Sequence, residues 1–475
     1  MIILNTDSKH PLYLQIYDQL KKQIISGEIP KGKKLPSTRK LSTILNVSRN
    51  TVESAYMQLS SEGYASRKAR SGFIVLKLDN SIISKLKKED IKTCKNFPLH
   101  LDYIDTTHNT YYKYNFEYGK LSAPDFPLRT WKRISNKCLS TISAEDMISY
   151  SASKGELELQ IEIMNYLRKS RGVSCSPEQI IISSGSDHSL SLLCQLFRRD
   201  FDKIALEDPG YIGAKDIFIN NGYNVIPINL QEDGINLDEL ENSLAKIVYI
   251  TPSHQFPMGD VMPIAKRLKL LDWGMRNNGI IIEDDYDSEL RYNSKPIPSI
   301  QSIDSNGSVI YIGTFSKALS PSLRLSYMVL PKVWLDKYNE RFKTYQVSTP
   351  IILQKIIHQF MHLGHFDRHL RKISLINKRK HDTLIHAIQE FMGDKVIIHA
   401  KNAGIHILLE LKDGLTEKEL ITKAKNRGIK VYPVSTFWIR KDKYPNNMVL
   451  LGFGGMSEND IFEGIRLLKE AWFIS

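Results

Sequence analysis

The feature that most constrains the fold is a series of short apolar runs that alternate with longer helical patterns across the middle of the chain. Buried runs separated by helices predict an α/β fold with a mostly parallel sheet covered by helices. Ligands of such sheets bind beyond the carboxyl ends of the strands, so we expect functional residues there. Seven runs carry this prediction, at residues 180–182, 203–206, 225–228, 247–250, 280–282, 309–312 and 324–330.

Length and charge narrow the class of protein. At 475 residues the chain is too long for one ordinary core, so two or more domains are expected. Its net charge of +13 favours a polyanionic partner. The sequence contains neither an apolar run of roughly 18 residues nor an apolar signal segment, which predicts a cytoplasmic protein without a membrane span. The four cysteines lack C-x-x-C spacing and are expected to be free thiols.

The first 80 residues are strongly basic, with 13 Lys and Arg against 6 Asp and Glu. Apolar side chains that recur every four residues predict a first amphipathic helix. Two shorter helices follow, preceded by Ser37 and Ser48, which can cap their N-termini. This is a helix-turn-helix layout, and a hairpin at 64–75 would add a wing. The expected core consists of Leu12, Ile16, Leu20, Ile24, Leu41, Ile44, Leu45, Val52, Ala55, Tyr56 and Leu59.

Four segments of residues 1–76 carry a family resemblance: Pro-Leu-Tyr-Leu-Gln-Ile-Tyr at 11–17, Leu-Pro-Ser-Thr-Arg-Lys-Leu at 35–41, Val-Ser-Arg-Asn-Thr-Val at 47–52 and Glu-Gly-Tyr at 62–64. They closely resemble the winged helix-turn-helix of GntR-type bacterial repressors, which implies binding to a double-stranded DNA operator. Arginine can bind guanine through two hydrogen bonds, while hydroxyls and helix N-termini favour phosphate. The expected DNA contacts are Ser37, Arg39, Ser48, Arg49 and Thr51, with Lys68, Arg70 and Gly72 on the wing. The alternative for each of these segments, taken alone, is a basic surface that contacts solvent and binds no DNA.

Residues 77–113 are polar and show no sustained hydrophobic period, apart from a possible short helix at 82–86. We interpret them as a linker. Residues 114–475 are then one large α/β domain.

Chemically distinctive residues follow three of the strand-like runs. Lys317 follows residues 309–312 and could act as an amine nucleophile if burial lowers its pKa. Ser186 and Asp187 open a helix whose first amides can bind phosphate. Asp284 follows residues 280–282 and could pair with a protonated pyridine nitrogen, while Tyr286 could hydrogen-bond a phenolic oxygen. Together these groups predict a site for pyridoxal 5′-phosphate (PLP).

The surrounding motifs are Glu-Asp-Pro-Gly-Tyr at 207–211, Thr-Pro-Ser-His-Gln-Phe-Pro at 251–257, Glu-Asp-Asp-Tyr-Asp-Ser-Glu at 283–289 and Gly-Thr-Phe-Ser-Lys at 313–317. They resemble fold-type-I aminotransferases, and the whole chain resembles the MocR/GabR family of transcription regulators. The resemblance implies a C-terminal α/β subdomain and a head-to-tail homodimer with swapped domains. It implies that Lys317 forms the Schiff base with PLP, that Asp284 and Tyr286 meet the ring nitrogen and the 3′-oxygen, and that Tyr211 stacks on the ring. It assigns the phosphate to Ser186, Asp187, Thr314, Ser316 and Arg324.

Two departures from the aminotransferase pattern bear on turnover. Phe256 replaces the asparagine that usually lies next to the 3′-oxygen. Residues 446–451 lack the arginine that often binds a substrate carboxylate, and Gly213 stands where a γ-aminobutyrate-sensing relative has an arginine. Lys215, Arg440 or the neighbouring subunit could substitute.

We therefore interpret the chain as a regulator in which an amine, an amino acid or PLP itself occupies the Lys317 site and changes operator binding, with negligible net transamination. The alternative is a working aminotransferase with a fused DNA-binding domain.

A histidine series has the spacing of one helix face. It consists of His358, His362, His365 and His369. No cysteine or carboxylate joins the series in sequence, and Gly364 interrupts it, so we interpret these residues as surface or packing histidines and predict no metal site.

Overall fold

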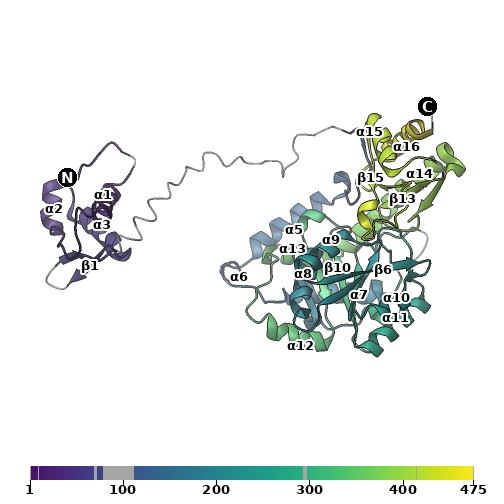
Figure 1. Ribbon diagram of the computed structural model, residues 1–475, viewed down its shortest axis with the longest axis horizontal. Helices are drawn as coiled ribbons and strands as arrows, with labels where there is room; N and C mark the ends of the chain where they lie inside the picture. The colour runs from purple at the N-terminus through teal and green to yellow at the C-terminus, as the bar shows by residue number, and fades with distance from the viewer. Residues whose placement is uncertain are drawn as a thin grey trace. The chain divides into compact units, whose positions relative to one another are not determined.

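The computed structural model describes residues 2–8, 10–68, 72–78, 112–292, 297–412 and 414–473. The chain divides into two compact units, Met1–Asn109 and Thr110–Ser475 (Figure 1). Arg70 and the helix expected at 82–86 lie outside the described residues.

The N-terminal unit contains three helices and a hairpin: α1 (Leu12–Ser26), α2 (Thr38–Leu45), α3 (Arg49–Ser61), β1 (Ala65–Lys68) and β2 (Gly72–Val75). The α3 residues expected in the core are fully buried, and β1 pairs antiparallel with β2. The prediction for Ile44 is wrong, because its side chain is 63% exposed. The buried face of α2 is centred on Leu41 and Ser42, and the helical rotation of about 100° per residue carries Ile44 away from it.

Ser48 caps α3, since its Oγ accepts a hydrogen bond from the Thr51 N–H at 3.1 Å. Ser48→Ala is expected to destabilise the first turn of α3 by about 1 kcal/mol, because a helix-terminal amide loses its acceptor. Hydrogen exchange of α3 amides in the full chain measures this. Ser60→Ala, late in the same helix, is the control, and equal exchange in both variants would contradict the capping role.

The C-terminal unit is built on an eight-stranded sheet in the order β4-β11-β10-β9-β8-β5-β6-β7 within the described residues. All seven predicted strands occur in it, and the pairs from β10 through β6 are parallel, so the predicted fold is confirmed. The sequence predicts that Gly313 ends the strand at 309–312, but β10 continues through Thr314, with Gly313 paired to β9 and Thr314 paired to Ser326 of β11. The bounds are β4 (Ile180–Ser183), β5 (Lys203–Asp208), β6 (Asn224–Gln231), β7 (Gly234–Ile235), β8 (Ile247–Ile250), β9 (Ile280–Asp285), β10 (Val309–Thr314) and β11 (Ser326–Val329).

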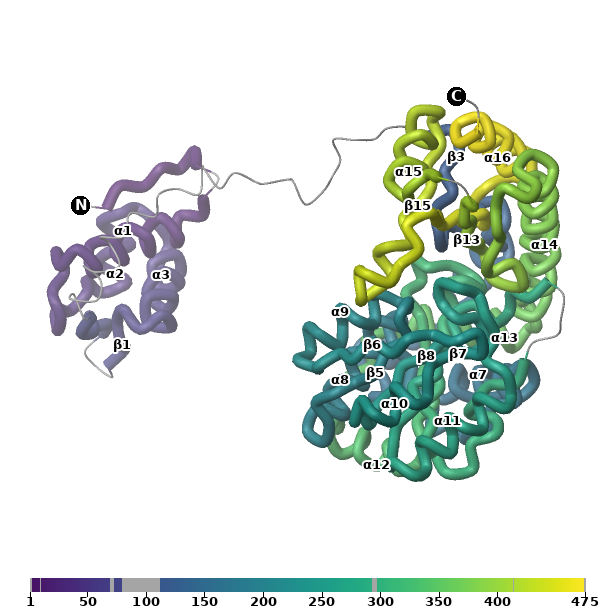
Figure 2. Tube along the Cα trace, turned by 45° about the vertical axis from the view of Figure 1, so that its right-hand side comes forward, coloured from purple at the N-terminus to yellow at the C-terminus, as the bar shows by residue number. Residues whose placement is uncertain are grey.

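Helices cover both faces of this sheet (Figures 1 and 2). Successive residues of a strand point to opposite faces. On β10, Ile310 and Ile312 therefore pack with one helix layer, while Val309 and Tyr311 pack with the other. The first layer contains α8 (Ser186–Phe197), α9 (Ile212–Asn220) and α12 (Lys332–Arg341). The second contains α5 (Leu128–Thr141), α7 (Leu157–Arg171), α10 (Leu237–Asn242), α11 (Ile264–Asn277) and α13 (Ile351–His362).

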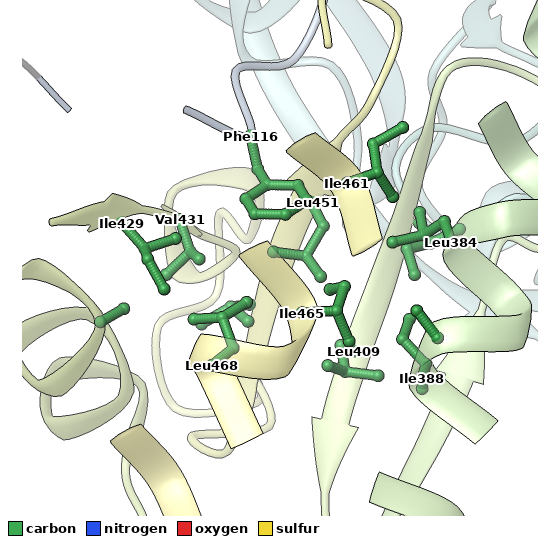
Figure 3. Close-up of a cluster of buried hydrophobic side chains, with 14 of the residues drawn as sticks. Phe116, Leu384, Ile388, Leu409, Ile429, Val431, Leu451, Ile461, Ile465 and Leu468 are labelled. Atoms are coloured by element: carbon green, nitrogen blue, oxygen red, sulfur yellow. The ribbon is translucent and has the colours of Figure 1, made fainter. Parts of the chain in front are cut away.

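The C-terminal subdomain has a second, antiparallel sheet in the order β12-β13-β16-β15. Its core joins Leu409 and Leu451 of the sheet to Leu384 and Ile465 of two helices, with Phe116 from the start of the unit (Figure 3). The elements are α14 (His365–Met392), β12 (Val396–His399), β13 (His406–Leu411), α15 (Glu417–Asn426), β15 (Tyr432–Pro433), β16 (Met448–Gly452) and α16 (Glu458–Phe473), beside a parallel pair of β3 (Tyr114–Asn115) and β14 (Ile429–Lys430). Among the described residues, no helix combines the length and the apolar character needed to cross a membrane.

Candidate cofactor site

A cavity of about 190 Å³ opens beside Lys317 at the carboxyl ends of the central strands. All nine residues predicted to bind PLP line it: Ser186, Asp187, Tyr211, Asp284, Tyr286, Thr314, Ser316, Lys317 and Arg324. Phe256 also lines the cavity. The sequence reasoning missed Tyr118, Tyr249, Thr251 and Pro321.

Strand pairing explains why these distant residues meet. β8, β9 and β10 are parallel, with Asp284 opposite Ile312. β4 runs in the same direction as β10, because each pairs antiparallel with β11. The start of α8 after β4 and Lys317 after β10 therefore lie at the same edge of the sheet.

Lys317 lies in the turn that follows β10. Its Nζ is 4.2 Å from the centroid of the Tyr118 ring. Gly119 allows this approach, since a Cβ there would lie 2.5 Å from Nζ. Burial lowers the pKa of Lys317 to about 8, although the Asp287 carboxylate acts in the opposite direction. About a tenth of this amine is therefore uncharged at pH 7, far more than for an ordinary lysine, and the uncharged form is the one that nucleophilic attack requires.

Asp284 has one oxygen that is hydrogen-bonded and one that is not. The Tyr249 hydroxyl donates to Oδ2 at 2.6 Å. Among the described residues, the buried Oδ1 has no hydrogen-bond partner. Burial raises the pKa of Asp284 to about 7, while the Tyr249 hydrogen bond lowers it. A buried acceptor without a partner is costly, so Oδ1 is suited to receive a proton donor from a ligand.

The neighbouring acids have structural partners on the other face of the sheet. Asp285 receives hydrogen bonds from Arg171 Nε at 2.6 Å and from the Tyr311 hydroxyl at 2.5 Å. The Glu283 carboxylate accepts hydrogen bonds from the backbone N–H groups of residues 300 and 301. Side chains of β9 alternate between the two faces of the sheet. Of the three consecutive acids at 283–285, Asp284 is therefore the one that lines the cavity.

Phosphate-binding groups gather at the start of α8. Its N-cap, Gly185, has φ 98°, and a Cβ there would lie 2.5 Å from Arg324 Nη2. The Arg324 guanidinium donates to Asp187 Oδ2 at 3.0 Å. Thr314 and Ser316 add hydroxyls 3.0 Å apart. A helix N-terminus, a guanidinium and hydroxyls together form a suitable site for a phosphate group.

The opposite wall is aromatic. Phe256 is only 3% exposed, and its ring centroid lies 5.1 Å from that of Tyr118 and 4.9 Å from that of Phe437. Tyr286 donates its hydroxyl to the His254 carbonyl at 3.0 Å, which fixes the ring at this wall. Where aminotransferases usually have an amide side chain, this cavity has an apolar surface.

The two cations considered as carboxylate anchors are engaged elsewhere. Arg440 Nη2 lies 2.6 Å from both Glu239 Oε1 and the carbonyl oxygen of Pro227. Lys215 Nζ lies 3.4 Å from Asp216 Oδ1. Neither lines the cavity, whose cationic lining among the described residues consists of Lys317 and Arg324.

In the N-terminal unit, the predicted DNA contacts lie at the starts of α2 and α3 and on the hairpin. Ser37 and Ser48 cap the two helices, while the Arg39 and Arg49 side chains are exposed. Thr51 is half-buried and accepts or donates a 2.8 Å hydrogen bond with Ser48. Lys68 and Gly72 lie opposite each other on the hairpin. Exposed Lys40 and Arg67 add charge that the sequence reasoning did not single out.

Known proteins match both units. Residues 12–75 match bacterial regulatory proteins of the gntR family, and residues 117–448 match aminotransferase class I and II. Over 99% of both chains, this protein is 38% identical to the uncharacterized HTH-type transcriptional regulator YdeL of Bacillus subtilis. The chain belongs to the MocR/GabR family of transcription regulators.

One further relative and one solved structure show what this MocR/GabR protein is similar to. It is 30% identical to the probable rhizopine catabolism regulatory protein MocR of Rhizobium meliloti, over 99% of this chain and 96% of that one. The fold is similar to that of the multiple substrate aminotransferase of Thermococcus profundus, with a TM-score of 0.69 and 27% identity over 79% of this chain and 94% of that one. The GntR domain implies DNA binding, and the aminotransferase domain belongs to a PLP-binding fold family.

Proposed function

We propose that this MocR/GabR-family protein binds PLP in the cavity beside Lys317 and that occupancy of this site changes its affinity for operator DNA. The observation that carries the proposal is the buried Oδ1 of Asp284, which has no hydrogen-bond partner among the described residues, in the cavity that also contains Lys317. A pyridine N–H is the donor that such an oxygen accepts, and a lysine of lowered pKa is the amine that an aldehyde requires.

The nine lining residues predicted from the sequence then each have a role toward the cofactor. Asp284 accepts the ring N–H, Tyr286 hydrogen-bonds the 3′-oxygen, Tyr211 stacks on the ring, and Lys317 holds the cofactor covalently. The phosphate-binding residues are Ser186, Asp187, Thr314, Ser316 and Arg324, with Asp187 contributing through its backbone amide. When bound, PLP supplies an electrophilic carbon that reacts with amines.

Titration of the purified full-length protein with PLP tests this assignment. We expect a visible absorbance band from the covalently held cofactor, and borohydride should fix the label to the peptide that contains Lys317. A protein that remained colourless after incubation with PLP would refute the cofactor assignment.

The rate of covalent loading should depend on pH. Because burial lowers the pKa of Lys317 to about 8, the reactive neutral amine is scarce at pH 6 and predominates above pH 9. Stopped-flow absorbance should therefore show a loading rate that rises through about pH 8 and then levels off. A loading rate that kept rising to about pH 10, as for an ordinary lysine, would show that burial does not lower the pKa of Lys317.

The cavity supports a sensor better than an enzyme. The described residues lining it offer no cation for a substrate carboxylate beyond Lys317 and Arg324, and Phe256 replaces a polar group. We therefore expect an amine, an amino acid or PLP itself to act as the effector, without net transamination. Sustained turnover of an amino acid and keto acid pair at rates near the roughly 10 s⁻¹ typical of enzymes would favour the aminotransferase alternative.

We also propose that the protein works as a cytoplasmic homodimer, since winged-helix operators usually contain two half-sites. Exposed large apolar side chains from α5 to the start of α7 support a second copy of the chain as partner. They are Leu128, Leu139, Met147, Ile148, Tyr150 and Leu157. Light scattering of the full chain should give the mass of two chains.

A further inference from the structure

Two of the four histidines in the predicted series lie beside a carboxylate from another helix. His358 and His362 are one turn apart on α13, and Glu162 lies on α7. His362 Nδ1 is 2.9 Å from Glu162 Oε1, and the two imidazole centroids are 5.5 Å apart. One ligand atom from each of these three residues lies within 4.8 Å of the others. Small side-chain rotations would bring them to the roughly 3.3 Å separation of donors around one tetrahedral zinc ion.

The other two histidines have different partners. Gly364, with φ 68°, separates α13 from α14 and splits the series. His365 lies 3.0 Å from Arg368 and from Arg133, which makes it a poor cation ligand. Burial lowers the pKa of His369 to about 4, and its ring hydrogen-bonds the Ala318 backbone. The expectation of no metal site relied on the absence of a nearby carboxylate in sequence, and Glu162 provides one from a distant segment.

The electrostatic surroundings favour a cation. His358 is half-buried, and the neutral imidazole is the form that binds metals. Glu158, one turn before Glu162 on α7, places a carboxylate at the same cavity as His358. Lys355 carries the opposite charge but is paired with Asp146 at 3.5 Å.

The site is also accessible. His362 is exposed, with 59% of its side chain in contact with solvent. On the other side, His358 and Glu158 line a cavity of about 280 Å³. That space can hold water in the coordination positions that protein atoms leave open.

We propose that Glu162, His358 and His362 bind one divalent transition-metal ion, with Zn²⁺ the best match, and that the ion ties α7 to α13. Two imidazoles and one carboxylate with an open position are a ligand set that Zn²⁺ accepts, whereas Mg²⁺ and Ca²⁺ prefer oxygen ligands alone. The site is separate from the PLP cavity, because none of its three residues lines that cavity. An ion bound only to the folded protein would raise its thermal stability.

Calorimetric titration of the EDTA-treated, PLP-free full-length protein with ZnCl₂ tests the site. We expect one ion per chain, a higher melting temperature, and visible d–d absorbance when Co²⁺ replaces Zn²⁺. His362→Ala and Glu162→Gln should each weaken binding by about tenfold or more. Because His362 is exposed and Glu162→Gln preserves side-chain volume, both variants should fold, which circular dichroism checks.

His386→Ala is the matched control. His386 forms an exposed pair with Glu390 at 3.5 Å on α14. Its removal should leave Zn²⁺ affinity unchanged. Wild-type affinity in His362→Ala and Glu162→Gln, or wild-type binding weaker than about 100 μM, would mean that these residues form only a histidine–glutamate ion pair and would overturn the proposal.

Discussion

Lys317→Ala is expected to abolish covalent attachment of PLP while the protein remains folded. Lys317 is the single lysine among the described residues that line the cavity, so no other amine there can replace it. Its removal also takes a partly desolvated amine away from the Tyr118 ring, which should not destabilise the core. Lys317→Arg should give the same loss, because it keeps a cation and removes the reactive amine.

Mass spectrometry after borohydride treatment measures this effect, and Lys332→Ala, at an exposed position at the start of α12, serves as the control. The control should retain the label on the Lys317 peptide. Undiminished label in Lys317→Ala, on any other lysine, would show that the attachment site lies elsewhere. An unfolded Lys317→Ala variant would contradict the view that Lys317 serves function and not stability.

Arg49→Ala is expected to weaken specific operator binding by about 1–3 kcal/mol, or roughly 5- to 150-fold. Arg49 is exposed in the first turn of α3, where a recognition helix reads base edges. Lys22→Ala removes the same charge from an exposed position on α1 and should change affinity far less. Lys68→Ala, on the hairpin, should mainly reduce the salt dependence.

Fluorescence anisotropy on operator and scrambled duplexes, at two salt concentrations, separates these effects. Arg49→Ala should lose most of the preference for the operator. If Arg49→Ala and Lys22→Ala behaved alike on both duplexes, α3 would not be the base-reading helix.

Much of the fold could be predicted because apolar runs and helix caps are local signals. Ser37 and Ser48 each cap a helix as expected. The error at Ile44 arose because the width of a buried helix face depends on its neighbours and not on hydrophobicity alone. The error at Gly313 arose because a glycine without φ > 0 can continue a paired strand.

The cavity residues that could be predicted are those that lie within a few residues of a strand end. Tyr249 was missed because its contact with Asp284 depends on the pairing of β8 with β9, which the sequence does not specify. Tyr118 was missed because it comes from a distant segment that carries no motif. Glu162 was missed for the same reason, since only the packed helices bring it to His362.

We propose that occupancy of the Lys317 site controls DNA binding. The most direct measurement is operator affinity of one preparation of the full-length protein in three states: PLP-free, PLP-loaded, and PLP-loaded with a panel of amines and amino acids. We expect at least two of these states to differ in operator affinity by about fivefold or more, and we expect Lys317→Ala to remove the difference. A difference between the first two states identifies PLP as the signal, and one that needs both ligands identifies an amine. Equal operator affinity in all states, with absorbance confirming that PLP is bound, would show that this site does not control DNA binding.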